Sequence, residues 1–489
     1  MRNYTKALIN NIERTYTYAH ATNAYGYTGH ARTYDPIDFF EHLLKTENPF
    51  YVFMKLERHS FRNSKNALDR YEIPYTEEEE RKARIYTDVT EEMQMQRSDA
   101  ISMHVDEEDL KESGVVLYAE PFVLTTKETI YVKESIEKLP RNKLTFNHVQ
   151  KTPKITLKEQ VDALETCLSY QISCLIGGAG TGKSFVTAEI INQLQQNRKQ
   201  TVVLAPTHKA REALQDKLNE QYIHSKVRTI HSFVHNPVEC DAIVIDESGM
   251  LSTPLLYKLM QIYNNQQIVF VGDKNQIPPV EYGRPFEKIQ ELFPVAELTH
   301  NHRSESKDII ALGREILGIP QNANMPIENI ELVSTTEEAF EKGAQVALTF
   351  TNANVAAINE EQRLKDQEET IAEGFSVGDK IIAKTNNSQA GYFNGQLFTL
   401  INWNTAGSER GKQIKFSDER DLKYNFDLAY GLTIHKSQGS EWDVVAYQPT
   451  NNDTRNLAYV AVTRAKKKLI IISDEIRTSF LPEREWRHL

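Results

Sequence analysis

At 489 residues, the chain is too long for one ordinary hydrophobic core, and we expect two to four domains. Apolar residues make up 40% and charged residues 26%, which is typical of a soluble globular protein. No run of about eighteen apolar residues occurs and the N-terminus lacks a secretory apolar segment, so we expect neither a transmembrane helix nor a signal peptide. The net charge of −11 argues against a surface coated in basic residues, although a local basic groove still binds nucleic acid.

The three cysteines, Cys167, Cys174 and Cys240, show no metal-ligand spacing. They suit a reducing compartment, and we expect a protein of the cytoplasm of a bacterial or phage-infected cell, without a membrane partner.

Three regions follow one another along the chain. Residues 1–150 are rich in tyrosine and charge, and we interpret them as an N-terminal accessory domain of unknown role that could dock a protein partner. From about 155 to 300, short β-branched strands alternate with polar helical stretches, which predicts a parallel α/β sheet. The same alternation resumes from 300 to 489. Between 374 and 428 it is interrupted by short strands rich in Gly and Asn, which indicates a small inserted β-barrel.

A phosphate-binding loop follows the apolar strand 173–176. The stretch GGAGTGKS at 177–184 fits G-x-x-x-x-G-K-[ST] and opens a helix, as the motif requires. Its backbone amides and the helix N-terminus favour bound phosphate. We expect Lys183 to reach the β- and γ-phosphates of ATP and the Ser184 hydroxyl to ligate Mg²⁺. The remaining predicted loop contacts are Gly177, Gly178, Ala179, Gly180, Thr181 and Gly182.

Acidic residues end the next predicted strand, 242–245. Asp246 at the tip of that strand can hold Mg²⁺, and Glu247 can orient the attacking water as general base.

A third strand leads into VGDKNQIPPVEYG at 271–283. It ends at the same carboxyl edge, where parallel sheets bind ligands, so Gln276 should lie at the height of the γ-phosphate. Pro278 and Pro279 fix φ in the chain that follows, and a change sensed at Gln276 would therefore be passed along the loop. We interpret the stretch as a nucleotide sensor.

The ordered set of motifs resembles superfamily 1 helicases, closest to the RecD/Dda-like branch. In the first motor domain the similar stretches are LKEQ at 157–160, APTHKA at 205–210, TIHS at 229–232, VIDESGM at 244–250, GDKNQIPPV at 272–280 and LTHNHR at 298–303. In the second they are TFTNANV at 349–355, LTIHKSQGSE at 432–441 and YVAVTRA at 459–465. The resemblance covers roughly residues 155–475.

This resemblance implies an α/β fold of two RecA-like P-loop motor domains, at 151–299 and at 300–373 with 429–489. An SH3-like β-barrel at 374–428 would be inserted in the second domain. ATP would bind in the cleft between the motor domains. Gln160 would read adenine, Gly439 and Glu441 would contact the nucleotide, and Arg303 and Arg464 would neutralise the γ-phosphate.

The resemblance also implies two grips on single-stranded DNA, although individual histidines could instead belong to the core. The first grip would be Thr207, His208, Thr229 and His231, and the second Asn352, Thr433, His435 and Lys436.

The function that the resemblance implies is ATP-dependent 5′→3′ translocation on single-stranded DNA and unwinding at single/double-strand junctions, in replication, recombination or repair. An alternative is a nucleic-acid-stimulated ATPase that loads or strips proteins without unwinding. RNA as the substrate is a third reading, and the SH3-like insertion is the feature that points to 5′→3′ travel.

One feature departs from the family. Members of this branch usually carry a β-hairpin wedge between the TIHS and magnesium motifs, but here only FVHNPVEC at 233–240 is available. A hairpin needs roughly eight to ten residues besides its connections. We expect the wedge to be missing or reduced, with Phe233 as its only large apolar candidate, and expect the 1–150 region to take part in strand separation.

Overall fold

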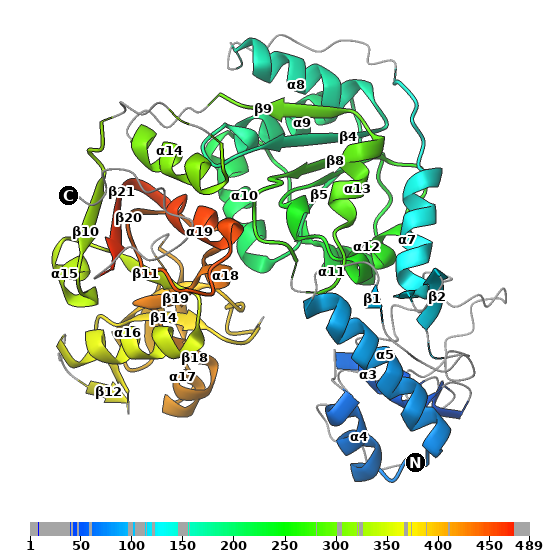
Figure 1. Ribbon diagram of the computed structural model, residues 1–489, viewed down its shortest axis with the longest axis horizontal. Coiled ribbons are helices and arrows are strands. Elements are labelled where there is room, and N and C mark those ends of the chain that lie inside the picture. The colour runs from blue at the N-terminus through cyan, green and yellow to red at the C-terminus, as the bar shows by residue number, and fades with distance from the viewer. Residues whose placement is uncertain are drawn as a thin grey trace.

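The computed structural model of the chain describes residues 8, 40, 43–45, 48–57, 61–95, 101–102, 113, 115–119, 123–144, 155, 157–279, 281–300, 306–319, 321, 326–365, 370–372, 374–387, 389–408 and 411–473. Two α/β units lie side by side, and the N-terminal region, in blue, packs beside the first of them (Figure 1). In these residues no helix combines the length and the apolar character needed to cross a bilayer.

The first α/β unit is built on a six-stranded parallel sheet in the order β6-β5-β7-β8-β4-β9. Its central strands are apolar and buried along their whole length, as expected for a parallel sheet covered on both faces. The strands are β4 (Ile172–Gly177), β5 (Thr201–Ala205), β6 (Val227–Thr229), β7 (Ala242–Ile245), β8 (Gln267–Gly272) and β9 (Val295–Leu298).

Alternate side chains of each strand enter different cores, because the side-chain period of a strand is two. Leu175 packs with helices α8, α9 and α10 on one face, whereas Cys174 and Ile176 pack with α11, α12 and α13 on the other. The helices are α8 (Lys158–Ser169), α9 (Lys183–Gln196), α10 (His208–Glu220), α11 (Ile230–His235), η2 (Ser248–Met250), α12 (Thr253–Met260) and α13 (Pro285–Leu292).

Helix α7 (Lys127–Lys138) lies within the range predicted as an accessory domain, yet it packs on the first α/β unit. Val132, Ile136 and Leu139 belong to the same core as α12 and α13, and the rings of Tyr131 and Tyr257 meet edge to face at 5.0 Å. This helix therefore covers part of the first parallel sheet.

The second α/β unit has a five-stranded parallel sheet in the order β10-β21-β20-β11-β19. Helices α14 and α19 cover one face, and α15 and α16 cover the other. The elements are β10 (Ile330–Val333), β11 (Val346–Thr349), β19 (Gly431–Thr433), β20 (Trp442–Tyr447), β21 (Ala465–Ile472), α14 (Lys307–Ile316), α15 (Thr336–Glu341), α16 (Asn352–Lys365), α18 (Ile434–Ser437) and α19 (Arg455–Val462). The predicted α/β class with two parallel sheets is thereby confirmed.

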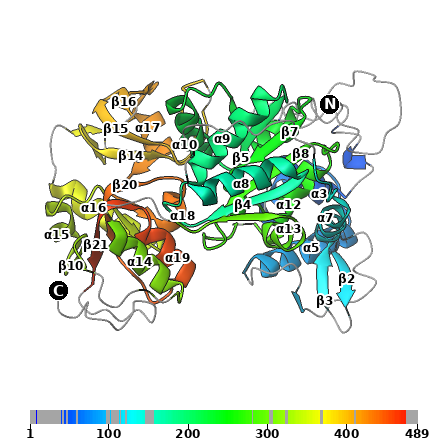
Figure 2. The same cartoon turned by 90° about the horizontal axis from the view of Figure 1, so that it is seen from above.

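An antiparallel sheet in the order β17-β16-β15-β14-β18 occupies the predicted insertion and has its own hydrophobic core. Figure 2 shows its strands beside α10 of the first unit. Its identification as an SH3-like barrel stays a prediction. Its elements, with a neighbouring two-stranded ribbon, are β12 (Thr370–Ala372), β13 (Phe375–Ser376), β14 (Lys380–Ala383), β15 (Leu397–Asn402), β16 (Thr405–Gly407), β17 (Gln413–Lys415), α17 (Glu419–Asn425) and β18 (Phe426–Leu428).

The N-terminal region combines helices with a small antiparallel sheet in the order β1-β3-β2. Its own core includes Phe50, Phe53 and Leu68, all fully buried. The elements are α3 (Pro49–Glu57), α4 (Phe61–Arg70), α5 (Glu77–Met95), β1 (Ile101–Ser102), β2 (Val115–Ala119) and β3 (Val123–Thr126).

Candidate nucleotide and nucleic-acid site

The predicted phosphate loop lies between β4 and α9, at the carboxyl edge of the first sheet. Gly180 and Gly182 have φ of 77° and 85°, a left-handed conformation that glycine adopts without strain. A Cβ on Gly177 would stand 2.6 Å from Thr181 Oγ1 and 2.9 Å from the Leu298 carbonyl oxygen. The glycines are therefore required by the shape of the loop.

Lys183 points into the loop that it follows. Its Nζ donates to the carbonyl oxygens of Gly177 at 2.6 Å and Gly178 at 2.8 Å. At the start of a fourteen-residue helix, this cation adds to the partial positive charge of the helix N-terminus. The arrangement suits a bound polyphosphate.

Lys217 of α10 interacts with both residues predicted to hold Mg²⁺, Ser184 and Asp246. Lys217 Nζ donates to Ser184 Oγ at 2.9 Å, and its charge opposes the rise that burial causes in the pKa of Asp246. In the described residues no group of three or more His, Cys, Asp or Glu could hold a metal ion. The hydroxyl and the carboxylate are hard oxygen donors of the kind with which Mg²⁺ is held together with substrate phosphates, so the donor set fits this ion.

Glu247 has a backbone φ of 52°, the left-handed region that costs a non-glycine residue about 1–3 kcal/mol. Burial and then the neighbouring Asp246 carboxylate raise the pKa of Glu247 to about 7, against the opposing charges of Lys183 and Arg464. A strained carboxyl group with a pKa near neutrality is what a general base at this position requires.

The stretch between β8 and α13 that was interpreted as a nucleotide sensor, here called the sensor loop, contacts both α/β units. The Ala179 backbone amide donates to Tyr459 Oη at 3.1 Å, and that hydroxyl donates to Asp273 Oδ2 at 3.0 Å. Tyr459 lies on α19 of the second unit, so one side chain spans the phosphate loop and the sensor loop. Sequence reasoning missed Tyr459 and Lys217. The signal for Tyr459 was its place in the YVAVTRA motif, and Lys217 lies outside every motif.

The sensor loop also enters the second unit. Asn456 Nδ2 donates to the carbonyl oxygen of Asn275 at 2.9 Å and that of Gln276 at 3.4 Å. Ile277 is 1% exposed and belongs to the hydrophobic core of the second unit, not to that of the first. The loop therefore bridges both α/β units, with the Gln276 side chain partly exposed.

The two predicted arginine fingers differ in what the structure describes. Arg464 is 5% exposed, and it donates from Nε to the Val460 carbonyl oxygen at 3.1 Å and from Nη1 to that of Ser440 at 3.2 Å. Its charge nevertheless lowers the pKa of Glu247, so it lies near the site. Arg303 lies outside the described residues.

Three other predicted nucleotide contacts come from both units, Gln160 from the first and Gly439 and Glu441 from the second. Gln160 is buried on α8 at 6% exposure, and Glu441 is exposed. Gly439, with φ of 75°, packs against the backbone of Ala210 at the start of α10. Their roles in nucleotide binding stay predictions.

Predicted DNA contacts lie at helix starts in both units. Thr207, Thr229 and Thr433 are the N-caps of α10, α11 and α18, each accepting a hydrogen bond from a backbone amide three residues on. His231 and His435 are half-buried, and Asn352 and Lys436 are exposed. No predicted histidine contact is therefore a fully buried core residue.

His208 is covered by the insertion. Its ring stacks on Phe393 with centroids 4.3 Å apart and planes 10° apart. The Arg211 guanidinium lies 5.1 Å from the centroid of the Phe393 ring. Gln396 of the insertion donates to the Glu212 carboxylate. In this structure the insertion therefore covers His208, one of the four residues of the first predicted grip.

The predicted lack of a hairpin wedge agrees with the structure. Residues 229–246, all of them described, contain α11 and β7 but no β-hairpin. Phe233, the candidate for a residual wedge, is 2% exposed and packs in the core below the sheet. The prediction that Phe233 forms a residual wedge is thus wrong, because its position on α11 places the ring in the hydrophobic core of the first unit.

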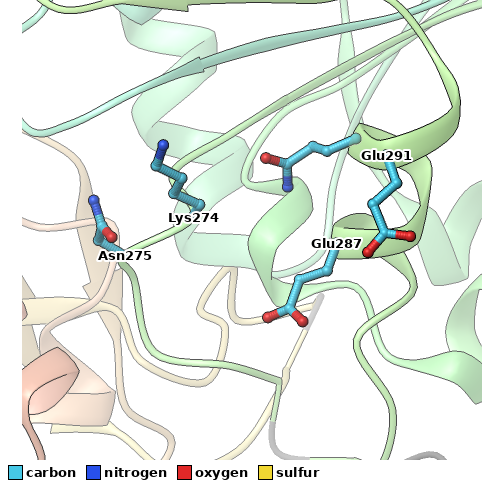
Figure 3. A pocket seen from close by; sticks show the side chains of 5 residues that line it. Lys274, Asn275, Glu287 and Glu291 are labelled. Atoms are coloured by element: carbon cyan, nitrogen blue, oxygen red, sulfur yellow. The ribbon is translucent and has the colours of Figure 1, made fainter.

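A shallow pocket lies beside the sensor loop, between Lys274 and Asn275 on the loop and three side chains of α13 (Figure 3). Glu287 and Glu291 make its far wall acidic, and no predicted site residue lines it. It is unsuited to phosphate, and no residue of the phosphate loop lines it.

Comparisons with known proteins agree with the motifs. Residues 156–319 match the family model of an AAA domain, and residues 428–472 match that of a UvrD-like helicase C-terminal domain. The "ATP-dependent RecD2 DNA helicase" of Deinococcus radiodurans is 26% identical over 368 residues, covering 65% of this chain and 49% of that protein. The "RecBCD enzyme subunit RecD" of Mycolicibacterium smegmatis is 25% identical over 409 residues, covering 67% of this chain and 73% of that protein.

An uncharacterised protein of Methanocaldococcus jannaschii is 24% identical, and this chain covers 40% of its length. The chain thus spans less than half of that protein and of the Deinococcus relative. Among solved structures, Pif1 helicase from Bacteroides in complex with ADP-AlF3 and ssDNA has a TM-score of 0.45 at 18% identity, covering 68% of this chain and 96% of that one. The two domain matches and the RecD and RecD2 relatives confirm the predicted resemblance, and the chain is similar to superfamily 1 helicases of the RecD-like type.

Proposed function

We propose that this protein is an ATP-dependent DNA helicase that translocates 5′→3′ on single-stranded DNA. The observation that carries the proposal is Tyr459, which reaches from the second motor unit to both the phosphate loop and the sensor loop of the first. A nucleotide bound there is read by both units at once. Its hydrolysis is then able to change their relative position.

The chemistry is assigned to residues at the carboxyl edge of the first sheet. Lys183 binds the β- and γ-phosphates, and Glu247 takes a proton from the attacking water. Mg²⁺, held by Ser184 and Asp246, would neutralise phosphate charge. Since Lys217 now contacts Ser184, it moves aside when the nucleotide binds.

Arg464 supplies positive charge from the second unit in the closed state. Its present hydrogen bonds go to carbonyl oxygens of its own unit, Val460 and Ser440. A change of rotamer or of domain angle brings it to the γ-phosphate, so that hydrolysis is fast only when the units have closed.

Strand movement follows from grips that belong to different units. Thr207 and His208 begin α10 of the first unit, whereas Thr433 begins α18 of the second. When the cleft between the units closes and opens, the two units move relative to each other, and the distance between the grips changes with them. Contacts through hydroxyls and imidazoles position the strand without reading its sequence. His208 contacts DNA after Phe393 has moved off its ring.

Support for DNA as the substrate comes from the matched motifs and from the printed names of the relatives, a DNA helicase and RecBCD subunits. The direction of travel rests on the insertion at 374–428 being the SH3-like barrel of the RecD-like branch. Its antiparallel sheet, with an independent core, is compatible with that assignment.

The test is ATPase activity with and without single-stranded DNA, followed by strand separation on duplexes with a 5′ or a 3′ tail. We expect DNA to stimulate the ATPase and only the 5′-tailed duplex to be unwound. Lys183→Ala serves as the inactive control. Unwinding from the 3′ tail alone refutes the polarity. Stimulated ATPase without separation of either duplex instead indicates a loader or a protein-stripping remodeller.

A further inference from the structure

The sensor loop contacts a third body besides the two motor units. It runs from β8 to α13, and residues 273–277 face the second motor unit through Tyr459, Asn456 and the buried Ile277. A few residues later, Tyr282 is 6% exposed and lies in a hydrophobic cluster of the N-terminal region. One short segment thus touches the nucleotide site, the second motor unit and the N-terminal region.

The N-terminal side of this contact is well packed. The Tyr282 ring shares its cluster with Val89 and Met93 of α5 and with Val115 of β2. Its hydroxyl lies 3.1 Å from Thr126 Oγ1, the N-cap of α7, and it also hydrogen-bonds Tyr86. Both a packed ring and a paired hydroxyl therefore attach the loop to this region.

The segment between the two contacts is four residues long, and its first two residues are prolines. Only residues 278–281 separate Ile277 from Tyr282, and Pro278 and Pro279 have fixed φ. The far end is held on α12, because the Thr253 amide donates to the Tyr282 carbonyl oxygen at 3.0 Å and Ser252 Oγ donates to the Glu281 carboxylate at 2.5 Å. A displacement of Ile277 therefore pulls on Tyr282 and on the start of α12 together.

We propose that Tyr282 is a positioning residue, which places the N-terminal region according to the nucleotide state of the motor. This inference rests on the proposed function, in which ATP binding moves the second unit and with it Ile277. The loop then pulls Tyr282, together with the start of α12, against α5 and the start of α7. The N-terminal region is in this way moved once in each ATP cycle, although it carries none of the predicted ATP-binding residues.

The inference gives the N-terminal region a role in coupling. Since residues 229–246 hold no hairpin, the part that acts on the duplex is expected elsewhere in the protein. A region joined to the sensor loop through Tyr282 is placed to deliver motor movement to the junction between single and double strands.

The direct test is hydrogen exchange of the full-length protein with and without a non-hydrolysable ATP analogue. In the wild type we expect the analogue to change exchange at residues 83–93 of α5 and at 125–129, far from the phosphate loop. Tyr282→Ala, which removes the ring, should reduce that change at least several-fold while basal ATPase stays within about twofold. Tyr282→Phe keeps the ring and should retain most of the response.

Leu68→Ala is the matched control, because Leu68 is fully buried in the separate core of the same region. Leu68→Ala should raise hydrogen exchange in the N-terminal region by the same amount with and without the analogue. The difference in exchange that the analogue causes should therefore stay as in the wild type. The proposal is overturned by a wild type without that difference, or by a Tyr282→Ala protein that keeps it. Should Tyr282→Ala fail to fold, Tyr282→Leu replaces it with the same expectation.

Strand separation is measured in parallel. Tyr282→Ala should unwind less duplex for each ATP hydrolysed, and Tyr282→Phe should restore the yield. A wild type that binds the analogue but never unwinds DNA refutes the proposed helicase function, while the exchange result still decides the role of Tyr282. The two failures are therefore distinguishable.

Discussion

Replacing Ile277 with alanine tests whether the sensor loop holds the motor units together. Ile277 comes from the first unit but is 1% exposed inside the core of the second. The substitution removes three carbons, and at about 0.8 kcal/mol for each buried methylene the docking of the loop on the second unit loses about 2.4 kcal/mol. A tenfold change corresponds to about 1.4 kcal/mol, so this docking should weaken by about 50-fold. A residual cavity would increase the loss.

The assay is energy transfer between dyes on the two motor units, titrated with a non-hydrolysable ATP analogue. Ile277→Ala should require more analogue for closure, whereas Ile277→Val should lie between it and the wild type. Ile268→Ala is the matched control, because Ile268 is fully buried in the core of the first unit. It should lower the melting temperature without changing closure. If Ile277→Ala closes as readily as the wild type, the packing does not couple the units.

Lys183→Ala should abolish ATP turnover while folding survives, because the loop is built from backbone; hydrolysis near the wild-type rate contradicts the phosphate site. Glu247→Gln should bind ATP yet hydrolyse it about two to four orders of magnitude more slowly, and a rate within a few-fold removes Glu247 from the base role. Gln276→Ala should keep some basal ATPase but lose its stimulation by DNA, and equal loss of both rates contradicts a sensor. Lys209 of α10 donates from Nζ to the Lys436 carbonyl oxygen of the second unit at 2.7 Å. Burial and then Arg464 lower the pKa of Lys209 from 10.5 to about 7, so separation of the units takes up protons between pH 7 and 10.5, and raising the pH from 7 to about 9 should favour closure in the energy-transfer assay. A pH-independent closure refutes this role of Lys209.

Features that depend on neighbouring residues in the chain could be predicted from the sequence. The phosphate loop needs glycines at Gly180 and Gly182 because their φ values are positive, and such a requirement is visible in the residue types. Asp246 and Asp273 follow apolar strands, and the carboxyl ends of parallel strands meet at one edge of the sheet. The α/β class and the geometry of the phosphate loop were therefore predictable.

Contacts that join distant segments left no comparable signal. Tyr459 lies 280 positions from Ala179, and nothing in either stretch requires a hydroxyl to meet that amide. His208 was predicted as a DNA contact, and only the tertiary structure shows Phe393 stacked on it. Lys217 is one polar residue of an ordinary helix, yet it reaches Ser184. Such pairs depend on how the units pack.

The predicted domain boundary near residue 150 also could not reveal a tertiary contact, because it separates α7 from the sheet on which that helix packs. A truncation beginning near residue 150 removes α7, whose Val132, Ile136 and Leu139 fill the core beneath the motor sheet. A loss of unwinding in such a protein could come from a damaged motor alone. Beginning instead at residue 123 keeps α7, but it strips α5 and β2 from Tyr282 and exposes a buried ring. Substitution at Tyr282 disturbs the contact while both bodies keep their own cores, so it separates coupling from motor integrity where neither truncation can.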